Sequence, residues 1–296
     1  MSRTAPSPQS IRMELRSSLA LVQRVETGRE RLVSPPVALG EPEVDSRLGG
    51  GLAHAALHEF FAANPADASA LAGFAILLTM RAELCGKPVI WVREDRGDRN
   101  NGRLYALGLV ELGADPARFT IVHAPDTLSL LRAGADIVKC SGVGAVFIEP
   151  WGKANELDLT ASRRLSMAAA RSGVMTLLLR AGSGAGAGIW AEPQPSAAMT
   201  RWRIGCAPSM PLRSFGPDIE PDTFAPGPPT FEIEMLRHRG GLPNFTARLE
   251  WNRDRNSFET SHPRLDPGIY NDTSLSRDLP AVPVFGKYPD GGSRAA

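Results

Sequence analysis

Residues 53–65 read Ala-His-Ala-Ala-Leu-His-Glu-Phe-Phe-Ala-Ala-Asn-Pro, and a largely apolar run from Asp67 to Leu84 follows them. A glycine-rich turn, Leu48-Gly49-Gly50-Gly51-Leu52, comes just before. This order of glycine-rich turn, short apolar strand, tight turn and long helix is the order used by a P-loop phosphate-binding unit. We therefore predict a strand, a turn and a helix here.

The turn itself lacks the groups that bind phosphate. Residues 62–69 read Ala-Ala-Asn-Pro-Ala-Asp-Ala-Ser, without a Gly-Lys-Ser/Thr sequence. Proline removes a backbone donor, no lysine supplies positive charge, and Asp67 at the helix start can accept from the free N–H groups itself. Taken alone, the stretch is compatible both with a lost phosphate site and with an ordinary helix capped by Asp67 or Ser69.

Composition is that of a soluble globular protein. The chain has 296 residues, 43% of them hydrophobic and 22% charged, with a formal net charge of +1. Nucleic-acid binding would therefore need a local basic patch. The three cysteines, Cys85, Cys140 and Cys206, are far apart and odd in number, so we expect neither disulfides nor zinc. Without an apolar signal segment at the start, a cytoplasmic location is expected.

From Leu52 to Arg180, short apolar runs alternate with helical segments, which predicts an α/β fold with a mostly parallel central sheet flanked by helices. The expected strands are 55–61, 88–92, 119–123, 145–148 and 174–179, and the expected helices are 67–84, 99–112, 126–139 and 156–172. In such sheets ligand sites lie beyond the carboxyl ends of the strands. Glu94 or Asp95 follows the second strand and Glu149 follows the fourth.

The two ends of the chain differ from this central part. Residues 9–32 predict an amphipathic helix, which ends at a Pro-rich joint and is equally suited to packing on its own core or on a partner. Strands 230–237 and 244–251 predict a β-hairpin that extends the sheet. We therefore expect an N-terminal helix and linker at 1–36, a core at 37–259 and a disordered Pro-rich tail at 260–296. The apolar face of the helix carries Ile11, Leu15, Leu19 and Val22.

Over roughly residues 44–258 the sequence resembles the RecA-like family, and within it the ImuA family of accessory proteins of damage-inducible (SOS) mutagenesis. The resemblance is carried by the glycine-rich turn, by Pro88-Val89-Ile90-Trp91-Val92-Arg93-Glu94-Asp95 and by Ala145-Val146-Phe147-Ile148-Glu149. The last of these stands where RecA-like proteins end a strand in the Walker B aspartate. A late hairpin, Phe231 to Arg239, is a further match, and no single motif is highly specific.

The departures from the ATPase pattern predict a protein that is not an enzyme. The Walker A lysine and hydroxyl have no counterpart, Glu149-Pro150 replaces the Walker B aspartate, and Arg180 stands where RecA has a nucleotide-sensing glutamine. Phosphoryl transfer depends on positioned cations and donors, so their joint loss argues against hydrolysis. We expect no cofactor, no metal and no catalytic residue. The resemblance instead implies a degenerate nucleotide site at Asn64, Asp67, Ser69, Glu94, Asp95 and Glu149.

The resemblance also implies contacts with DNA and with neighbouring subunits. The segment 182–196 stands where RecA-like proteins carry DNA-contacting loops, and the candidate contacts to single-stranded DNA are Trp190, Gln194, Arg201, Trp202 and Arg203. Arg237 and Arg239 correspond to a basic pair that reaches the nucleotide of the next subunit. We expect them to pair with Asp67, Glu94 or Glu149 of a neighbour, alongside the N-terminal helix. The alternatives are a solvated linker at 182–196, a core position for Trp202 with Arg201 and Arg203 outside, and solvated arginines at 237 and 239.

Three functions remain after these comparisons. An ImuA-like protein would assemble a translesion-synthesis complex with an error-prone polymerase, a polymerase-like bridging protein and RecA, and would self-associate. A SulA-like cell-division inhibitor of the SOS response would bind a tubulin-like protein, but the length of the chain and its late hairpin weigh against it. A RecA-like ATPase with an atypical phosphate loop would bind nucleotide, which a titration tests. The first is the main expectation.

Overall fold

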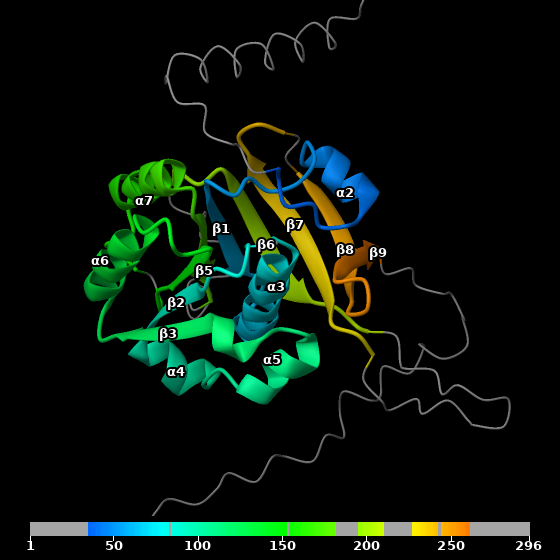
Figure 1. The fold of residues 1–296 in the computed structure, drawn as a ribbon, viewed down its shortest axis with the longest axis horizontal. Coiled ribbons are helices and arrows are strands. Elements are labelled where there is room, and N and C mark those ends of the chain that lie inside the picture. Colours follow the sequence, from blue (N-terminus) through cyan, green and yellow to red (C-terminus); the bar gives the residue numbers. More distant parts are fainter. Residues whose placement is uncertain are drawn as a thin grey trace, which may run out of the picture. The chain divides into compact units, whose positions relative to one another are not determined.

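A mixed β-sheet forms the centre of the computed structural model, which describes residues 35–82, 84–152, 154–181, 195–209, 227–241 and 244–260. Within these residues the sheet has 9 strands in the order β3-β2-β4-β5-β1-β6-β7-β8-β9 (Figure 1). The first six run parallel, and β7, β8 and β9 continue antiparallel. The predicted N-terminal helix, Trp190, Gln194 and residues 261–296 lie outside the described residues.

The strand bounds follow the predicted apolar runs closely. The parallel strands are β1 (Leu57–Ala62), β2 (Val89–Glu94), β3 (Phe119–Ala124), β4 (Ala145–Glu149), β5 (Met175–Arg180) and β6 (Thr200–Cys206). The antiparallel strands are β7 (Thr230–His238), β8 (Phe245–Asn252) and β9 (Ser257–Thr260). Every residue of β4 and β5 is buried, whereas β7 and β8 alternate buried and accessible residues. This is the difference expected between strands covered on both faces and strands covered on one.

Helices cover the two faces of the parallel strands separately (Figure 1). The helix α3 (Ala68–Arg81) packs with Phe60, Phe147 and Trp202 on one face. The helices α6 (Thr127–Val138) and α7 (Leu159–Ser172) pack on the other, against Leu57 and Val146 among others. Because the residues of a strand alternate between faces, this division fixes where each polar side chain of β1, β2, β4 and β6 points.

An aromatic cluster joins α3 to the antiparallel strands. Phe74 of α3 contacts Phe60, Phe231 and Phe258, with ring centroids 5.9, 5.5 and 5.1 Å away. Trp202 is fully buried and stacks on Phe60 at 6.2 Å. Each such side chain buries a large apolar area, so this cluster ties the hairpin extension firmly to the core. The predicted hairpin that extends the sheet is therefore confirmed.

Three elements differ from the expectations. The helix predicted at 99–112 is two helices, α4 (Asp95–Asn101) and α5 (Ala106–Leu112), because Gly102 between them has φ +76, which ends the first one. The joint after the N-terminal segment contains α2 (Pro42–Arg47), whose first turn is capped by Glu41. The strand β9 was not predicted either. It is short and follows a tight turn, so alternation over four residues gave little signal.

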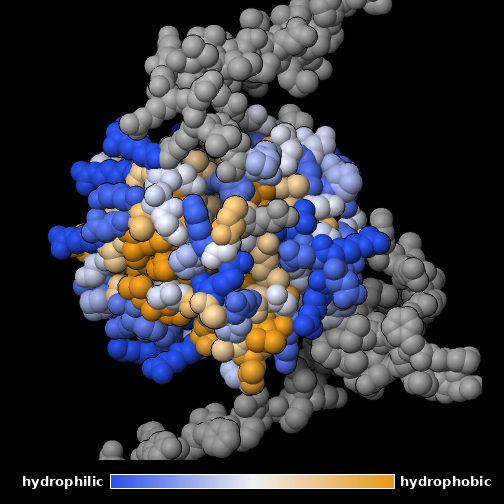
Figure 2. All heavy atoms as spheres, viewed as in Figure 1, coloured by the Kyte–Doolittle hydropathy of each residue, from blue (hydrophilic) through white to orange (hydrophobic). Residues whose placement is uncertain are grey.

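Exposed apolar side chains gather at α5 on the surface of the described residues. Tyr105, Leu107 and Val110 are exposed there, and Figure 2 shows hydrophobic residues gathered where Figure 1 draws this helix. Among the helices that the structure describes, none is long and apolar enough to cross a membrane.

Candidate functional site: buried carboxylates bonded within the chain

The turn between β1 and α3 is closed by Asp67. After β1 come Ala63, Asn64 and a single 3-10 turn, Pro65–Asp67, before α3 begins. The Oδ2 atom of Asp67 accepts from the backbone N and from Nδ2 of Asn64, both at 3.0 Å. Its Oδ1 atom accepts from the backbone N of Cys206, at the end of β6, also at 3.0 Å. The donors of the turn thus already have an anionic acceptor from the chain itself.

The environment of Asp67 keeps its carboxyl ionised. The residue is buried, and burial alone would raise its pKa. The hydrogen bonds from Cys206 and Asn64 outweigh burial, so the pKa lies below its ordinary value. Ser69, also expected at this site, is exposed on the first turn of α3. A phosphate entering this turn would meet a negative charge where a P-loop offers N–H groups.

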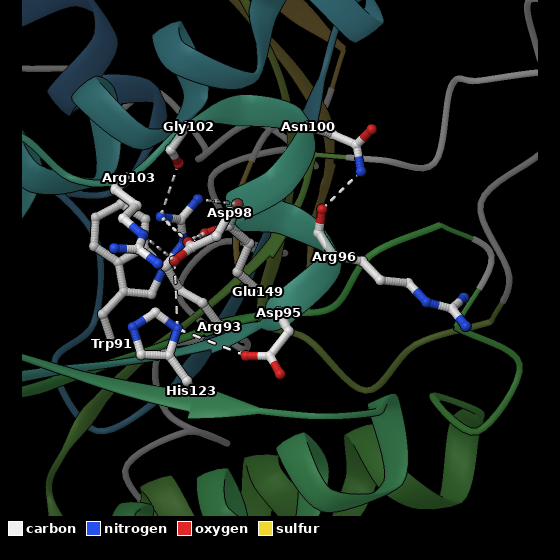
Figure 3. A network of polar contacts seen from close by, with 10 residues as sticks. All are labelled: Trp91, Arg93, Asp95, Arg96, Asp98, Asn100, Gly102, Arg103, His123 and Glu149. Atoms are coloured by element: carbon white, nitrogen blue, oxygen red, sulfur yellow. Dashed lines mark hydrogen bonds and ion pairs between the residues drawn. The ribbon is translucent and has the colours of Figure 1, made fainter. Parts of the chain in front are cut away.

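The carboxylate at the Walker B position, Glu149, is held by Arg93 (Figure 3). Nε of Arg93 lies 2.9 Å from Oε2 of Glu149, and Nη2 lies 3.4 Å from Oε1. The indole Nε1 of Trp91 donates to the same Oε2 at 2.8 Å. Both charged side chains are buried, and the guanidinium group lies over the Trp91 ring, 5.0 Å from its centroid. A divalent cation would have to displace Arg93 to reach this carboxylate.

Burial is the largest influence on Glu149 and raises the pKa of its carboxyl, while the charge and hydrogen bonds of Arg93 and the Trp91 donor act in the opposite direction. Because two donors point at the carboxylate, we take it as ionised and paired at neutral pH. The ionised form of Glu149 is therefore stabilised mainly by Arg93.

The network extends from Arg93 to α4 and to the edge strand (Figure 3). Nη1 of Arg93 lies 2.7 Å from Oδ1 of Asp98 and donates to the carbonyl oxygen of Gly102 at 3.4 Å. Asp98 also approaches Nδ1 of His123 at 3.4 Å, and Asp95 lies 3.9 Å from the same nitrogen. Asp95 thus sits at the accessible rim of a network whose centre is Arg93.

Glu94 and Glu149 do not form a carboxylate pair. Arg93 and Glu149 are register partners on one face of the sheet, so Glu94, the next residue of β2, points to the other face. There it accepts from Oγ1 of Thr127 at 2.9 Å and from the backbone N of Trp151 at 3.2 Å. The structure therefore separates two acids that the sequence placed at neighbouring strand ends, because strand parity decides the face.

The structure contradicts two of the expected DNA contacts on β6. Trp202 is fully buried against Phe60, so its ring has no face free for a base. Arg201 is buried and its Nε lies 2.9 Å from Oε2 of Glu59. Arg203 is partly accessible and pairs with Glu234. The strand is buried over most of its length, and the side that carries Trp202 and Ile204 faces the aromatic core.

Arg237 and Arg239 are exposed, and they lie near the opposite end of β6 from Asp67. Thr200, at the start of β6, pairs with His238, whereas Cys206, at its end, contacts Asp67. Six residue steps separate the two ends, which is about 20 Å of strand. The carboxylates expected to meet these arginines from a neighbour, Asp67, Glu94 and Glu149, are buried and bonded internally. Because these carboxylates are bonded within the chain, the structure gives no support to that pairing, which stays a prediction.

Two buried charged groups, one of them at the centre of the site, had no prediction from the sequence. Arg93 belongs to a strand expected to be buried, and a charge in such a strand signals a buried partner. The same signal marks Glu59 in β1, which binds Arg180 at 3.3 Å as well as Arg201. No group of three or more metal-binding side chains suited to a metal ion occurs among the described residues.

Comparison with known proteins places the chain in a family. Protein ImuA of Caulobacter vibrioides, from two strains, is 34% identical over 219 residues, covering 72% of this chain and 82% of the relative. The crystal structure of the RadB recombinase matches with a TM-score of 0.50 at 18% identity, covering 76% of this chain and 100% of that one. No protein-family model matches the sequence. The RadB likeness shows the RecA-like fold, and the ImuA relatives show that this chain belongs to the ImuA family.

Proposed function

We propose that this protein is a non-catalytic RecA-fold accessory protein of DNA-damage-induced mutagenesis. In this role it assembles a translesion-synthesis complex with an error-prone polymerase, a polymerase-like bridging protein and RecA. Membership of the ImuA family supports the role in mutagenesis. The RecA-like fold supports a function in which the protein acts by contacting other proteins through the surfaces of that fold.

The single observation that carries the non-catalytic part is the internal occupation of both halves of the nucleotide position. Asp67 accepts from the donors of the β1–α3 turn, and Arg93 pairs with Glu149 at the end of β4. A working site needs free donors for the phosphates and a free carboxylate for the magnesium ion. Here the donors of the turn bind the carboxylate of Asp67, and the carboxylate of Glu149 binds the guanidinium group of Arg93.

Two alternatives are weaker on specific grounds. An ATPase with an atypical loop would have to expel Asp67 and Arg93 from buried, bonded positions before nucleotide could bind. A SulA-like inhibitor of cell division has no support from the relatives, which are named ImuA and are matched by this chain over 82% of their length.

The test of the assembly role uses the full chain, tagged and recovered from cells treated with a DNA-damaging agent. We expect the error-prone polymerase and its bridging protein to be recovered with it, and damage-induced mutation frequency to fall when the protein is absent. The matched sample lacks residues 261–296, which tests the tail as a binding segment. Recovery of a tubulin-like division protein in their place would contradict the proposal.

A further inference from the structure

The outward side of α7 alternates apolar and cationic residues. The helix contains three arginines and neither aspartate nor glutamate. Leu159, Arg163, Met167 and Arg171 follow one another at four-residue spacing, which places them along one side of the helix. All four are exposed, Leu159 by 40% and Met167 by 45%. Leu159 and Met167 therefore offer two accessible apolar contacts, one on each side of Arg163.

A second element extends this side of α7. The backbone N of Ala197 donates to Oγ of Ser162 on α7 at 3.1 Å, and the carbonyl oxygen of the preceding Ser196 accepts from Nη1 of Arg237 at 3.1 Å. Nη2 of Arg239 reaches the same carbonyl at 3.5 Å. The end of β7 is therefore fastened beside the N-terminal half of α7.

The arginines of the two elements form one positive cluster. Burial first, and then the nearby charges of Arg237 and Arg163, hold the pKa of Arg239 below its ordinary value. None of these three arginines forms an ion pair with a carboxylate of the described residues. Three like charges held together cost free energy, which an anionic partner would recover.

We propose that Leu159, Arg163, Met167, Arg237 and Arg239, here called the α7 surface, bind an acidic amphipathic segment of a protein partner. Glutamates or aspartates of the segment would pair with the three arginines, and its apolar residues would cover Leu159 and Met167. Arginine and methionine are among the residues enriched in protein interfaces. In Figure 2, strongly hydrophilic and hydrophobic residues lie intermixed over the region where Figure 1 draws α6 and α7.

Two other occupants fit the surface less well. A nucleic-acid backbone would meet the arginines but leave Leu159 and Met167 without a partner, and the formal net charge of +1 provides no broad positive field. A second copy would have to present exposed carboxylates beside apolar side chains, and the three carboxylates expected to meet Arg237 and Arg239, namely Asp67, Glu94 and Glu149, are buried and bonded. The inference rests on the proposed assembly role and adds the place at which a partner docks.

The experiment measures fluorescence anisotropy of two labelled probes with the full chain. One probe is a helical peptide of glutamates with leucines at helical spacing, and the other is an oligothymidine of matched charge. We expect the peptide to bind more tightly, with an affinity that falls with salt. Arg163→Glu and the Arg237→Glu/Arg239→Glu pair should each weaken it about tenfold, and Met167→Ser severalfold. The control is Arg99→Glu, an exposed arginine on α4, which should leave binding unchanged.

The proposal is overturned if the peptide does not bind, or if it binds the Arg163→Glu protein as well as the wild type. It is also overturned if oligothymidine binds more tightly and Met167→Ser has no effect, since that pattern describes a nucleic-acid surface. Unchanged melting curves confirm that the variants fold. If the peptide result is negative while the full chain still recovers its polymerase partners from damaged cells, the α7 surface is wrong and the proposed function stands.

Discussion

Nε of Arg93 lies 2.9 Å from Oε2 of Glu149, and both side chains are buried at the carboxyl ends of neighbouring strands. The pair stands where a RecA-like ATPase keeps a carboxylate available to a magnesium ion. Under the proposed function, the guanidinium group of Arg93 occupies the carboxylate that a working ATPase would leave open for the ion.

The first prediction concerns the stability of this pair. Arg93→Met should lower the free energy of unfolding by about 3–5 kcal/mol, because it leaves Glu149 buried without its cation. The double change Arg93→Met/Glu149→Leu should restore part of this loss, since it removes the unpaired Glu149 but still leaves Asp98 without Arg93. Urea unfolding at neutral pH measures both.

The same variant predicts a pH dependence of defined sign. With Arg93 removed, only the weaker hydrogen bond from Trp91 opposes the effect of burial, which raises the pKa of Glu149. A carboxyl whose pKa is raised in the folded state makes folding more favourable at low pH. This part of the stability is lost as pH rises through the raised pKa. The Arg93→Met protein should therefore recover stability, relative to wild type, as the solution is made more acidic. The matched control is Arg99→Met, and a deficit independent of pH would contradict the pairing.

The second prediction concerns His58, which is fully buried in β1. Its Nε2 donates to the carbonyl oxygen of Ala53 and its Nδ1 accepts from Thr200, whose Oγ1 in turn accepts from Nε1 of Trp202, each at 2.8 Å. Burial, the largest cause, lowers its pKa from 6.5 to about 4. The neutral form is thus favoured in the folded protein, so stability is full above pH 6.5 and is lost as pH falls toward 4.

Between pH 7 and pH 5 this histidine should account for a loss of about 2 kcal/mol. His58→Gln lowers stability at pH 7 but removes this part of the pH dependence, so the difference between wild type and variant should shrink on acidification. His54 and His238 are present in both proteins and cancel in the comparison. Parallel stability curves over this range would show that His58 titrates normally.

The third prediction concerns Asp67 and the thiol of Cys206. The hydrogen bond between the thiol and Asp67 is the main cause that raises the pKa of Cys206, and burial and the charge of Asp67 add to it. Asp67→Asn should therefore lower this pKa and speed alkylation of Cys206 by iodoacetamide at mildly alkaline pH. Cys85 and Cys140 are also exposed, so both are replaced by serine in the test protein. An unchanged alkylation rate would mean that Asp67 does not control the thiol.

Much of the fold follows from local pattern. The five apolar runs between residues 52 and 180 and the hairpin at β7 and β8 are strands within a few residues of their expected bounds, because buried parallel strands are continuous apolar runs and the hairpin alternates. The break at Gly102 and the short β9 were missed, since one glycine and four residues carry little periodic signal.

The site was less accessible to prediction. Asp67 was expected to take the N–H groups of its turn, and it accepts from Asn64, but its bond to Cys206 joins positions 139 residues apart. The Arg93–Glu149 pair likewise depends on the register between β2 and β4. Strand parity also moved Glu94 to the opposite face and Trp202 into the core. These are tertiary facts that the spacing of single residues does not contain.

The central claim is that the nucleotide position is closed by Asp67 and Arg93, and a calorimetric titration of the full chain with ATP and magnesium tests it most directly. No saturable binding is expected up to millimolar nucleotide, because both groups would have to leave buried, bonded positions. Micromolar affinity accompanied by magnesium-dependent turnover that Glu149→Gln abolishes would contradict the account.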